Sequence, residues 1–482
     1  MKTDVVFVQQ LPMPYFGILA MDAFLKKSGY RDDVLIDAYE KDLTGTLARL
    51  SPSVIGLSVF STEHRWLVEA IRRIRTSFPA TPIVVGGVHG LIYPEEILTD
   101  TLADLVCCGD GEETIVRIIK ESEKALPRWE TIPGIAYRQD RASILTTPAA
   151  RPVPYSADTI EDRALYFTRY PRLSHDKIGL FLSSRGCPHA CSFCYNTYLR
   201  SRSLDPKNYL RQKGVDDFIE EITRQTARVK YTMIYFLDDM FTFNVAWLRL
   251  FLKKYQERVG LPFVCNTRAD QMTDEIAELL SGAGCTFASF GIETGNARIR
   301  STILAKKITD DQIVHAAALL HRHRIGVRTS NMFCLPTETV SDALATVELN
   351  IRIHAESASS TLLLPYPKTA IHDYCQKSGL FLTDYTLYDM PHITQRTSVL
   401  DMPHKHMIFN CHYLLYWFAR YPWTYRIGKG LVYQEWLSGL FHLCYLAGYF
   451  IRNKNENGLG WFGSLRYAWR KRTLVFGMRR RS

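Results

Sequence analysis

Apolar and polar residues alternate in a strand-then-helix rhythm along the N-terminal part of the chain. Helical spacing appears in residues 18–29, where Leu19, Ala23 and Phe24 share one face and Gly29 supplies a stop. Short β-branched runs that end in polar residues or glycine are typical of buried strands, and five occur here: DVVFV, DVLIDAY, VIGLSVF, PIVVGG and ADLVCC. Strands with intervening helices predict a doubly wound parallel sheet, which binds its ligands beyond the carboxyl ends of its strands.

The alternation of strand and helix patterns stops in the middle of the chain and then resumes. Prolines break any long element between residues 130 and 175, which predicts a linker with one hairpin over residues 134–147. Helical patterns then recur, for example in residues 215–229 and 273–284. They separate six further strand patterns: IGLFLSS, TMIYFLDD, PFVCNTR, TFASFGIE, GVRTSNMF and STLLLPY. These predict a second parallel sheet, large enough to curl into a partial (β/α) barrel.

Glycines and polar residues gather where three strands of the first sheet are expected to end. Such glycines let a bulky ligand approach the backbone, and hydroxyls orient it without charge, although tight turns alone would also explain each glycine. Because three strand ends agree, we predict a cofactor site there. Its candidate residues are Ser58, Ser61, Thr62, Gly86, Gly87, His89, Gly109, Gly111 and Glu112.

Three of the eleven cysteines crowd into RGCPHACSFCYN, directly after the first strand of the second unit. Cys187, Cys191 and Cys194 form a C-x3-C-x2-C pattern on a loop. Thiolates hold iron-sulfur clusters, and three of them leave one iron of a four-iron cubane without a protein ligand. A zinc site usually takes four N or S ligands, a redox disulfide needs two cysteines, and inert cysteines would not recur after a strand with Gly and Pro. The pattern favours a [4Fe-4S] cluster.

These cysteines, with Phe193 just before the last of them, resemble the signature loop of the radical S-adenosylmethionine (SAM) superfamily. The resemblance implies that SAM chelates the open iron. One electron then gives methionine and a 5′-deoxyadenosyl radical, which abstracts hydrogen from the substrate. A flavodoxin or ferredoxin is the kind of electron donor that such an enzyme uses.

The ends of two later strands continue the resemblance. Asp238 and Asp239 occupy the place where the family binds the SAM amino group, although the commoner Gly-Glu sequence is absent. Asn266 and Arg268 suit the methionine carboxylate of SAM. A surface ion pair is the competing explanation for Asp238 or Arg268 taken alone. Their shared strand-end position favours a SAM site.

Two further segments carry the same resemblance. Glu293 in GIETGN matches the acidic residue that usually meets the SAM ribose or amino group, and Gly291 and Gly295 would let the ligand come close. Asn331 and Pro336 in NMFCLPTET resemble the loop near the adenine. The expected SAM site therefore draws on four strand ends.

Together the two sheets resemble the cobalamin-dependent radical SAM subgroup, over residues 1–390. SPSVIGLSVFST, VVGGVHG and CCGDGEET are similar to its cobalamin-binding loops, but the Asp-x-His-x-x-Gly motif that ligates cobalt through histidine is missing. Cobalamin is therefore expected without that ligand, and His89 with a structural role. The subgroup most often methylates an unactivated carbon of a natural-product, lipid or cofactor-type substrate. Other members cyclise, contract rings or oxidise.

Charge separates the C-terminal segment from the rest. Residues 401–482 hold 13 Lys and Arg against 3 Asp and Glu, which accounts for the whole net charge of +10. Interleaved aromatic residues favour a lipid surface or a partner, and no nucleic acid is expected. Residues 436–451 carry no charge but are shorter than a bilayer span. They fit either a helical cap over the barrel mouth or a peripheral membrane contact. In a membrane contact, RRRS would be an electrostatic tether, and the neighbouring aromatic anchors would be Trp417, Trp423, Trp461 and Trp469.

The predicted organisation has four parts: a Rossmann-like cobalamin-binding domain (1–135), a linker (136–175), a radical SAM partial barrel (176–390) and a basic aromatic C-terminal cap (391–482). The N-terminus lacks a secretory pattern, so we expect a cytoplasmic enzyme with reduced thiols. The favoured activity is C-methylation of a small molecule or lipid. A radical SAM cyclase or oxidoreductase, and a non-catalytic cluster or cobalamin sensor at a membrane, are the alternatives.

Overall fold

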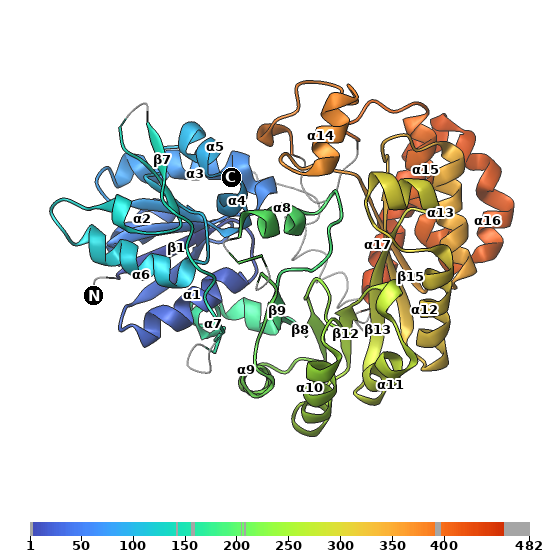
Figure 1. Cartoon of the computed structure of the whole chain (residues 1–482), viewed down its shortest axis with the longest axis horizontal. Helices are drawn as coiled ribbons and strands as arrows, with labels where there is room; N and C mark the ends of the chain where they lie inside the picture. The colour runs from blue at the N-terminus through green and yellow to red at the C-terminus, as the bar shows by residue number, and fades with distance from the viewer. Residues whose placement is uncertain are drawn as a thin grey trace. The chain divides into compact units, whose positions relative to one another are not determined.

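The computed structural model describes residues 3–140, 143–155, 160–203, 205–206, 209–390 and 397–456. The chain divides into two compact units (Figure 1). The first unit holds the described residues of Met1–Asp176, Leu199–Val229 and Leu387–Met390. The second unit holds the other described residues.

The first unit is built on a seven-stranded sheet, in the order β2-β1-β3-β4-β5-β6-β7. β1 to β5 pair in parallel, whereas β6 and β7 are antiparallel. The predicted five-stranded parallel sheet is confirmed, and the expected hairpin forms as β6 and β7, which extend the sheet beyond β5. The strands are β1 (Val5–Gln9), β2 (Asp32–Ile36), β3 (Val54–Ser58), β4 (Ile83–Gly86), β5 (Leu105–Cys107), β6 (Ile135–Arg138) and β7 (Ile144–Thr146).

Helices cover both faces of this sheet. Val5 and Phe7 of β1 pack into the core with α1, α6 and α7, whereas Val6 and Val8 pack into a second core with α2, α3 and α5. Successive strand residues point to opposite faces, so an apolar run buries itself on both sides. The helices of the first unit are α1 (Phe16–Lys27), α2 (Leu43–Leu50), α3 (His64–Ser77), α4 (Gly87–Ile92), α5 (Pro94–Asp100), α6 (Gly111–Ser122), α7 (Ala164–Arg169) and α9 (Val215–Arg228).

The second unit is built on a six-stranded sheet, in the order β15-β14-β13-β12-β11-β8, in which every pairing is parallel. All six predicted strands are present. They are β8 (Ile178–Phe181), β11 (Met233–Phe236), β12 (Phe263–Asn266), β13 (Cys285–Glu293), β14 (Gly326–Phe333) and β15 (Ser357–Leu362). β9 (Ser184–Arg185) is a further short strand of this unit, whereas β10 (Arg211–Gln212) belongs to the first unit.

A repeated cap starts the helices that return from these strands. Thr273, Thr309, Thr339 and Thr369 each accept a hydrogen bond from a backbone N–H three residues along the chain. Such caps satisfy donors that have no partner inside the helix, and they fix where each helix begins. The four helices with this cap are α11 (Asp274–Gly282), α12 (Asp310–Arg322), α13 (Val340–Arg352) and α14 (Ala370–Lys377). α10 (Val245–Arg258) has Asn244 as its cap, and α8 (Tyr195–Arg202) directly follows Cys194.

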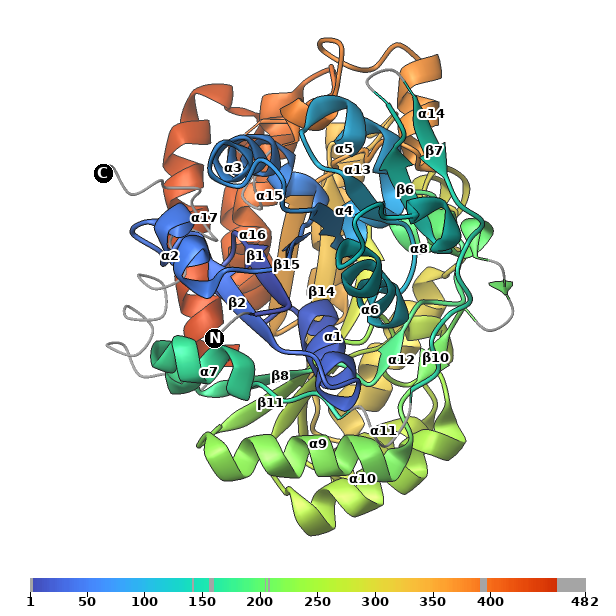
Figure 2. The ribbon, with the colours of Figure 1, turned by 90° about the vertical axis from the view of Figure 1, so that its left-hand side faces the viewer.

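Three helices follow the second sheet: α15 (Lys405–Arg420), α16 (Pro422–Gly428) and α17 (Ser438–Glu456). α15 is largely buried and packs along β15 and α13, and α16 and α17 pack on α15 (Figure 2). The C-terminal helices therefore lie beside the sheet, at its β15 edge. In the part of the chain that the structure describes, no helix is both long and apolar enough to cross a membrane. Trp461, Trp469 and the RRRS end lie outside that part.

Candidate functional site

The cysteine loop follows β8 and β9 and is tied to distant parts of the second unit. The backbone N–H of Ser192 donates to the carbonyl of Leu304 at 3.0 Å, and its hydroxyl donates to the carbonyl of Ile303 at 2.6 Å. The backbone N–H of Ile371 donates to the Ser192 carbonyl at 3.1 Å. Phe193 packs against an apolar cluster that contains Leu304. Ser192, which sequence reasoning did not single out, thus fixes the loop between the cysteines.

The three thiols of the loop are partly or fully buried. Burial raises the pKa of the Cys187 thiol, and it raises the pKa of Cys194 to about 11, so both need a bound metal to become thiolates at neutral pH. Among the described residues, no three Cys, His, Asp or Glu side chains converge on one ion position. In a cubane each thiolate binds a different iron, so the ligands need not converge. Three thiols on one loop therefore fit a [4Fe-4S] cluster with one iron open.

Asp238 and Asp239, after β11, have different surroundings. Asp238 is fully buried and accepts hydrogen bonds from the Ser183 backbone at 3.1 Å and from the Ser183 and Ser184 hydroxyls at 2.6 and 2.5 Å. Asp239 is exposed and accepts from Asn196 Nδ2 at 2.9 Å. Asp238 thus holds the chain just before the cysteine loop, whereas Asp239 offers a carboxylate beside it.

Asn266 and Arg268, at the end of β12, contact the same region. Asn266 donates to the backbone carbonyl of Asp238 at 3.0 Å. Arg268 donates to both carboxylate oxygens of Asp270, at 3.0 and 2.9 Å, and its other terminal nitrogen lies 4.0 Å from Cys191 Sγ. One edge of the guanidinium is therefore fixed by a carboxylate, and the other edge is turned toward a predicted cluster ligand.

Glu293, the last residue of β13, is paired with a lysine. Lys306 Nζ donates to Glu293 Oε1 at 2.6 Å, and the two side chains are 7% and 10% exposed. A Cβ on Gly291 would lie 1.9 Å from Glu293 Oε1 and 2.6 Å from Lys306 Nζ, so Gly291 makes room for this pair. Glu293 itself has φ 67°. Nothing in the sequence separates Lys306 from the neighbouring Lys307, so sequence reasoning missed it.

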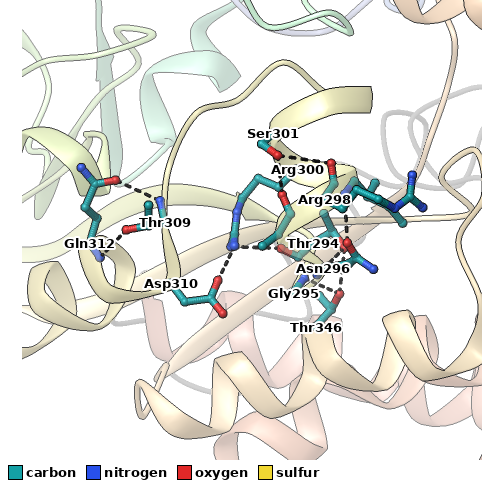
Figure 3. A network of polar contacts seen from close by, with 12 residues as sticks. Thr294, Gly295, Asn296, Arg298, Arg300, Ser301, Thr309, Asp310, Gln312 and Thr346 are labelled. Carbon is teal, nitrogen blue, oxygen red and sulfur yellow. Dashed lines mark hydrogen bonds and ion pairs between the residues drawn. The ribbon is translucent and has the colours of Figure 1, made fainter.

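The segment after Glu293 forms a polar corner (Figure 3). Arg300 is fully buried; it donates to the Thr294 carbonyl at 3.3 Å and forms an ion pair with Asp310. The Gly295 N–H donates to Thr346 Oγ1 at 2.8 Å, and a Cβ on Gly295 would lie 2.3 Å from the backbone of Ala345. Close packing against α13 therefore requires Gly295, a reason different from the ligand approach that the sequence suggested.

Asn331 and Pro336 complete the residues expected near SAM. The Asn331 amide donates to Thr329 Oγ1 at 3.0 Å and to the Ser359 carbonyl at 2.9 Å, and its oxygen accepts from Asn350 at 2.8 Å. Asn331 is thus part of an interior hydrogen-bond network. Pro336 is buried in the loop after β14.

The nine residues expected near cobalamin lie at the carboxyl ends of three adjacent strands of the first sheet. Ser58 ends β3, Gly86 ends β4, and the others follow in the turns or at the starts of the next helices: Ser61, Thr62, Gly87, His89, Gly109, Gly111 and Glu112. Sheets of this strand order bind ligands at that edge. The structure therefore brings these residues to one edge of one sheet.

Three contacts define this edge further. Gly87 has φ 81°, and a Cβ there would lie 2.7 Å from the Val59 backbone. The His89 ring Nε2 lies 2.9 Å from His64 Nδ1, and His64 Nε2 lies 3.0 Å from Asp100 Oδ2. His89 is thus buried in a hydrogen-bonded chain inside the first unit.

Two buried polar side chains at this edge, Ser61 and Glu63, help to judge whether a ligand fits there. Ser61 Oγ is buried and has no hydrogen-bond partner among the described residues, which is unusual unless a ligand or water supplies one. Glu63, which sequence reasoning missed, is buried and accepts from Tyr15 Oη at 3.0 Å and from the Phe60 N–H at 2.8 Å. Burial raises the pKa of Glu63 to about 7. The unpartnered hydroxyl fits a ligand such as cobalamin.

Comparisons with known proteins identify two domains in the chain. Residues 3–119 match the B12 binding domain family, and residues 181–349 match the radical SAM superfamily. An uncharacterized methyltransferase of Pyrococcus horikoshii is 25% identical over 77% of this chain and 80% of its own length. The cytidylyl-2-hydroxyethylphosphonate methyltransferase of Streptomyces wedmorensis is 21% identical, over 76% and 73%. The anaerobic magnesium-protoporphyrin IX monomethyl ester cyclase of Rubrivivax gelatinosus is 24% identical, over 73% and 65%.

Solved structures share the fold of almost the whole chain. The cobalamin-dependent SAM radical enzyme OxsB, with aqua-cobalamin and SAM bound, superposes with a TM-score of 0.70 at 15% identity, over 98% of this chain and 75% of its own. The radical SAM methyltransferase TsrM of Kitasatospora setae superposes with a TM-score of 0.65 at 18% identity, over 83% and 79%. The radical SAM and B12 binding domain matches support a [4Fe-4S] cluster, SAM and cobalamin as cofactors. With a B12-binding domain followed by a radical SAM domain, the chain belongs to the cobalamin-dependent radical SAM enzymes.

Proposed function

We propose that this enzyme methylates an unactivated carbon of a natural-product, lipid or cofactor-type substrate. The observation that carries the proposal is the presence on one chain of a three-cysteine loop and a B12-binding domain. When bound, the cluster and SAM supply an adenosyl radical, and cobalamin supplies the methyl group. Most named relatives are methyltransferases, which supports this reaction over the others.

The residues around the cysteine loop suit the charged ends of SAM. Asp239 is exposed beside the loop, so its carboxylate would bind the SAM ammonium, while Asp238 stays committed to Ser183 and Ser184. Arg268 would bind the methionine carboxylate with the edge that Asp270 leaves open. Glu293, held by Lys306, would accept hydrogen bonds from the ribose hydroxyls.

The first unit would bind cobalamin at the carboxyl edge of its sheet. The Ser61 hydroxyl would donate to the ligand, and the half-buried Gly86 and Gly109, where an added Cβ meets only ordinary contacts at 3.8 and 3.6 Å, would lie beside it. The His89 ring is hydrogen-bonded to His64, so we expect that His89 does not ligate cobalt. A flavodoxin or ferredoxin would deliver the electron.

Cyclisation or oxidation without methyl transfer is the second candidate. It is supported by the two anaerobic magnesium-protoporphyrin IX monomethyl ester cyclases among the relatives, each 24% identical. The products separate the two reactions. Methylation adds one methyl group to the substrate and yields S-adenosylhomocysteine beside 5′-deoxyadenosine, whereas cyclisation yields no S-adenosylhomocysteine.

The first test is anaerobic reconstitution with iron, sulfide and hydroxocobalamin, for the wild type, Cys191→Ala and the control Cys444→Ala, which lies outside the loop. We expect about four irons per chain, one cobalamin and 5′-deoxyadenosine from the wild type and the control. Cys191→Ala should lose the cluster and SAM cleavage but keep cobalamin. A wild type that cleaves SAM without binding cobalamin would remove the basis for methyl transfer.

A further inference from the structure

Large exposed apolar side chains gather in one part of the second unit. Half of those in the described residues lie between Tyr421 and Leu443. Five of them are more than half exposed: Trp423 (62%), Ile427 (74%), Trp436 (79%), Leu440 (55%) and Leu443 (62%). These five residues are named the C-terminal apolar face. Single exposed apolar residues are normal on a soluble protein, whereas a concentration of them marks an interaction surface.

Three members of the face, Trp436, Leu440 and Leu443, lie on α17 or its leading turn, whereas Trp423 and Ile427 lie on α16. Leu440, Leu443 and Ala447 are exposed, and their spacing continues that of Trp436, so the four share one side of α17 and its leading turn. Every exposed position from 439 to 447 is uncharged. A helix on the surface of a soluble domain normally turns charged residues outward, and α17 does the opposite.

The other side of α17 is fixed to the protein. Phe441 is buried, and Trp417 Nε1 of α15 donates to the Cys444 carbonyl at 2.8 Å. A Cβ on Gly448 would lie 2.9 Å from the Tyr416 ring, so the two helices pack closely there. The helix therefore cannot turn its apolar side inward without losing these contacts.

Charged residues within the C-terminal segment of the sequence are almost all positive. Arg420, Arg426 and Lys429 are exposed on and beside α16. Between residues 402 and 455 the only acidic residue is Glu435, and residues 457–482 contain seven Lys and Arg and no acid. Two copies of this surface would repel each other, whereas anionic headgroups would pair with it. Tryptophan and tyrosine beside basic residues suit the boundary between headgroups and acyl chains.

We propose that the C-terminal apolar face binds the surface of an anionic bilayer. Trp423 and Trp436 lie at headgroup level, Leu440 and Leu443 enter the acyl boundary, and the flanking arginines contact lipid phosphates. The contact is peripheral, since no helix among the described residues could span the membrane. It requires nothing of the reaction proposed above, so either proposal can fail alone.

The test is co-sedimentation of the reconstituted full-length protein with vesicles of phosphatidylcholine, alone or mixed with phosphatidylglycerol. The variant Leu440→Ser/Leu443→Ser removes two exposed apolar side chains of the face. The control Leu126→Ser/Leu250→Ser removes two leucines that are 84% and 59% exposed elsewhere. We expect the mixed vesicles to bind wild type and control alike, and the variant about tenfold or more weakly. High salt should weaken all binding.

Three results would overturn the proposal. The first is that wild type fails to bind the mixed vesicles. The second is that Leu440→Ser/Leu443→Ser binds as well as the control, which would assign the contact to residues outside the face. The third is a wild-type dimer in light scattering that the variant converts to monomer, which would make the face a subunit interface. Equal cluster absorbance and circular dichroism in all proteins show that the substitutions leave the fold intact.

Discussion

Glu293 and Glu63 are both buried beside a strand-end site, but their partners differ. Glu293, in the second unit, pairs with Lys306 at 2.6 Å. Glu63, in the first unit, accepts hydrogen bonds from a tyrosine hydroxyl and a backbone N–H, both neutral donors. The Glu293 carboxylate has a cation beside it, whereas the Glu63 carboxyl has only neutral donors and burial raises its pKa to about 7. The two units thus stabilise a buried carboxyl in different ways: one by pairing it with a charge, the other by letting it hold a proton near neutral pH.

The largest expected effect comes from breaking the ion pair. Lys306→Met should lower the free energy of unfolding by about 4 kcal/mol, because it leaves the Glu293 carboxylate buried without its cation. Adding Glu293→Gln should restore most of that stability without restoring SAM affinity. Urea unfolding and calorimetric titration with SAM measure the two quantities. If Lys306→Met bound SAM with wild-type affinity, Lys306 would not position Glu293.

The pH response of Glu63 sharpens the same comparison. Burial raises the pKa of Glu63 from 4.5 to about 7 in the folded protein, so the folded state binds more protons than the unfolded state between these values. Stability should therefore fall as pH rises from about 4.5 through 7, by about 3 kcal/mol in total. Glu63→Gln should flatten this slope in urea unfolding of the cobalamin-free protein. An unchanged slope would mean that other groups cause it.

Gly87→Ala tests the geometry of the first edge. Gly87 and Gly29 both have positive φ, of 81° and 80°, but an added Cβ meets the Val59 backbone at 2.7 Å only at Gly87. Gly29→Ala should therefore cost about 1 kcal/mol of stability, and Gly87→Ala about 2 kcal/mol or more, with loss of bound cobalamin. Thermal unfolding and cobalt content measure these effects. Equal losses in the two variants would show that backbone strain alone matters at Gly87.

Ser61→Ala should have the smallest effect. Because Ser61 Oγ has no partner among the described residues, its removal should leave the stability of the cobalamin-free protein within about 0.5 kcal/mol or raise it. Cobalamin affinity should fall by about 1 kcal/mol if the hydroxyl donates to the ligand. Spectroscopic titration with hydroxocobalamin gives the affinity. An affinity that did not change would remove Ser61 from the cobalamin site.

The local sequence pattern was enough to predict the strands and the cysteine loop. β-branched runs ended by glycine or polar residues indicated both parallel sheets, because burial on both faces leaves an apolar run that can be read without knowing its neighbours. The pairing of β6 with β5 was not predicted, since a short hairpin carries no signal for the strand it joins. The position of α15 along β15 was missed for a similar reason: an apolar helix does not specify which surface it covers.

Contacts between residues far apart in the sequence explain which residue roles at the site were not predicted. Lys306 meets Glu293 from 13 residues away, and Gly295 is needed because of Ala345, 50 residues later in the chain. The role of Asp238 follows from Ser183 and Ser184, 55 and 54 residues before it. Each of these depends on how strands and helices come together, so residue type and spacing alone could not reveal it.

The bonds that hold Ser192 also bear on the order in which the enzyme matures. Its partners Ile303, Leu304 and Ile371 are synthesised long after the cysteines, so a nascent chain carries the three thiols before these hydrogen bonds can form. Iron inserted early would meet flexible ligands, whereas iron inserted after residue 371 has emerged meets a loop already held at both sides. We therefore expect fragments that stop before α14 to load iron poorly.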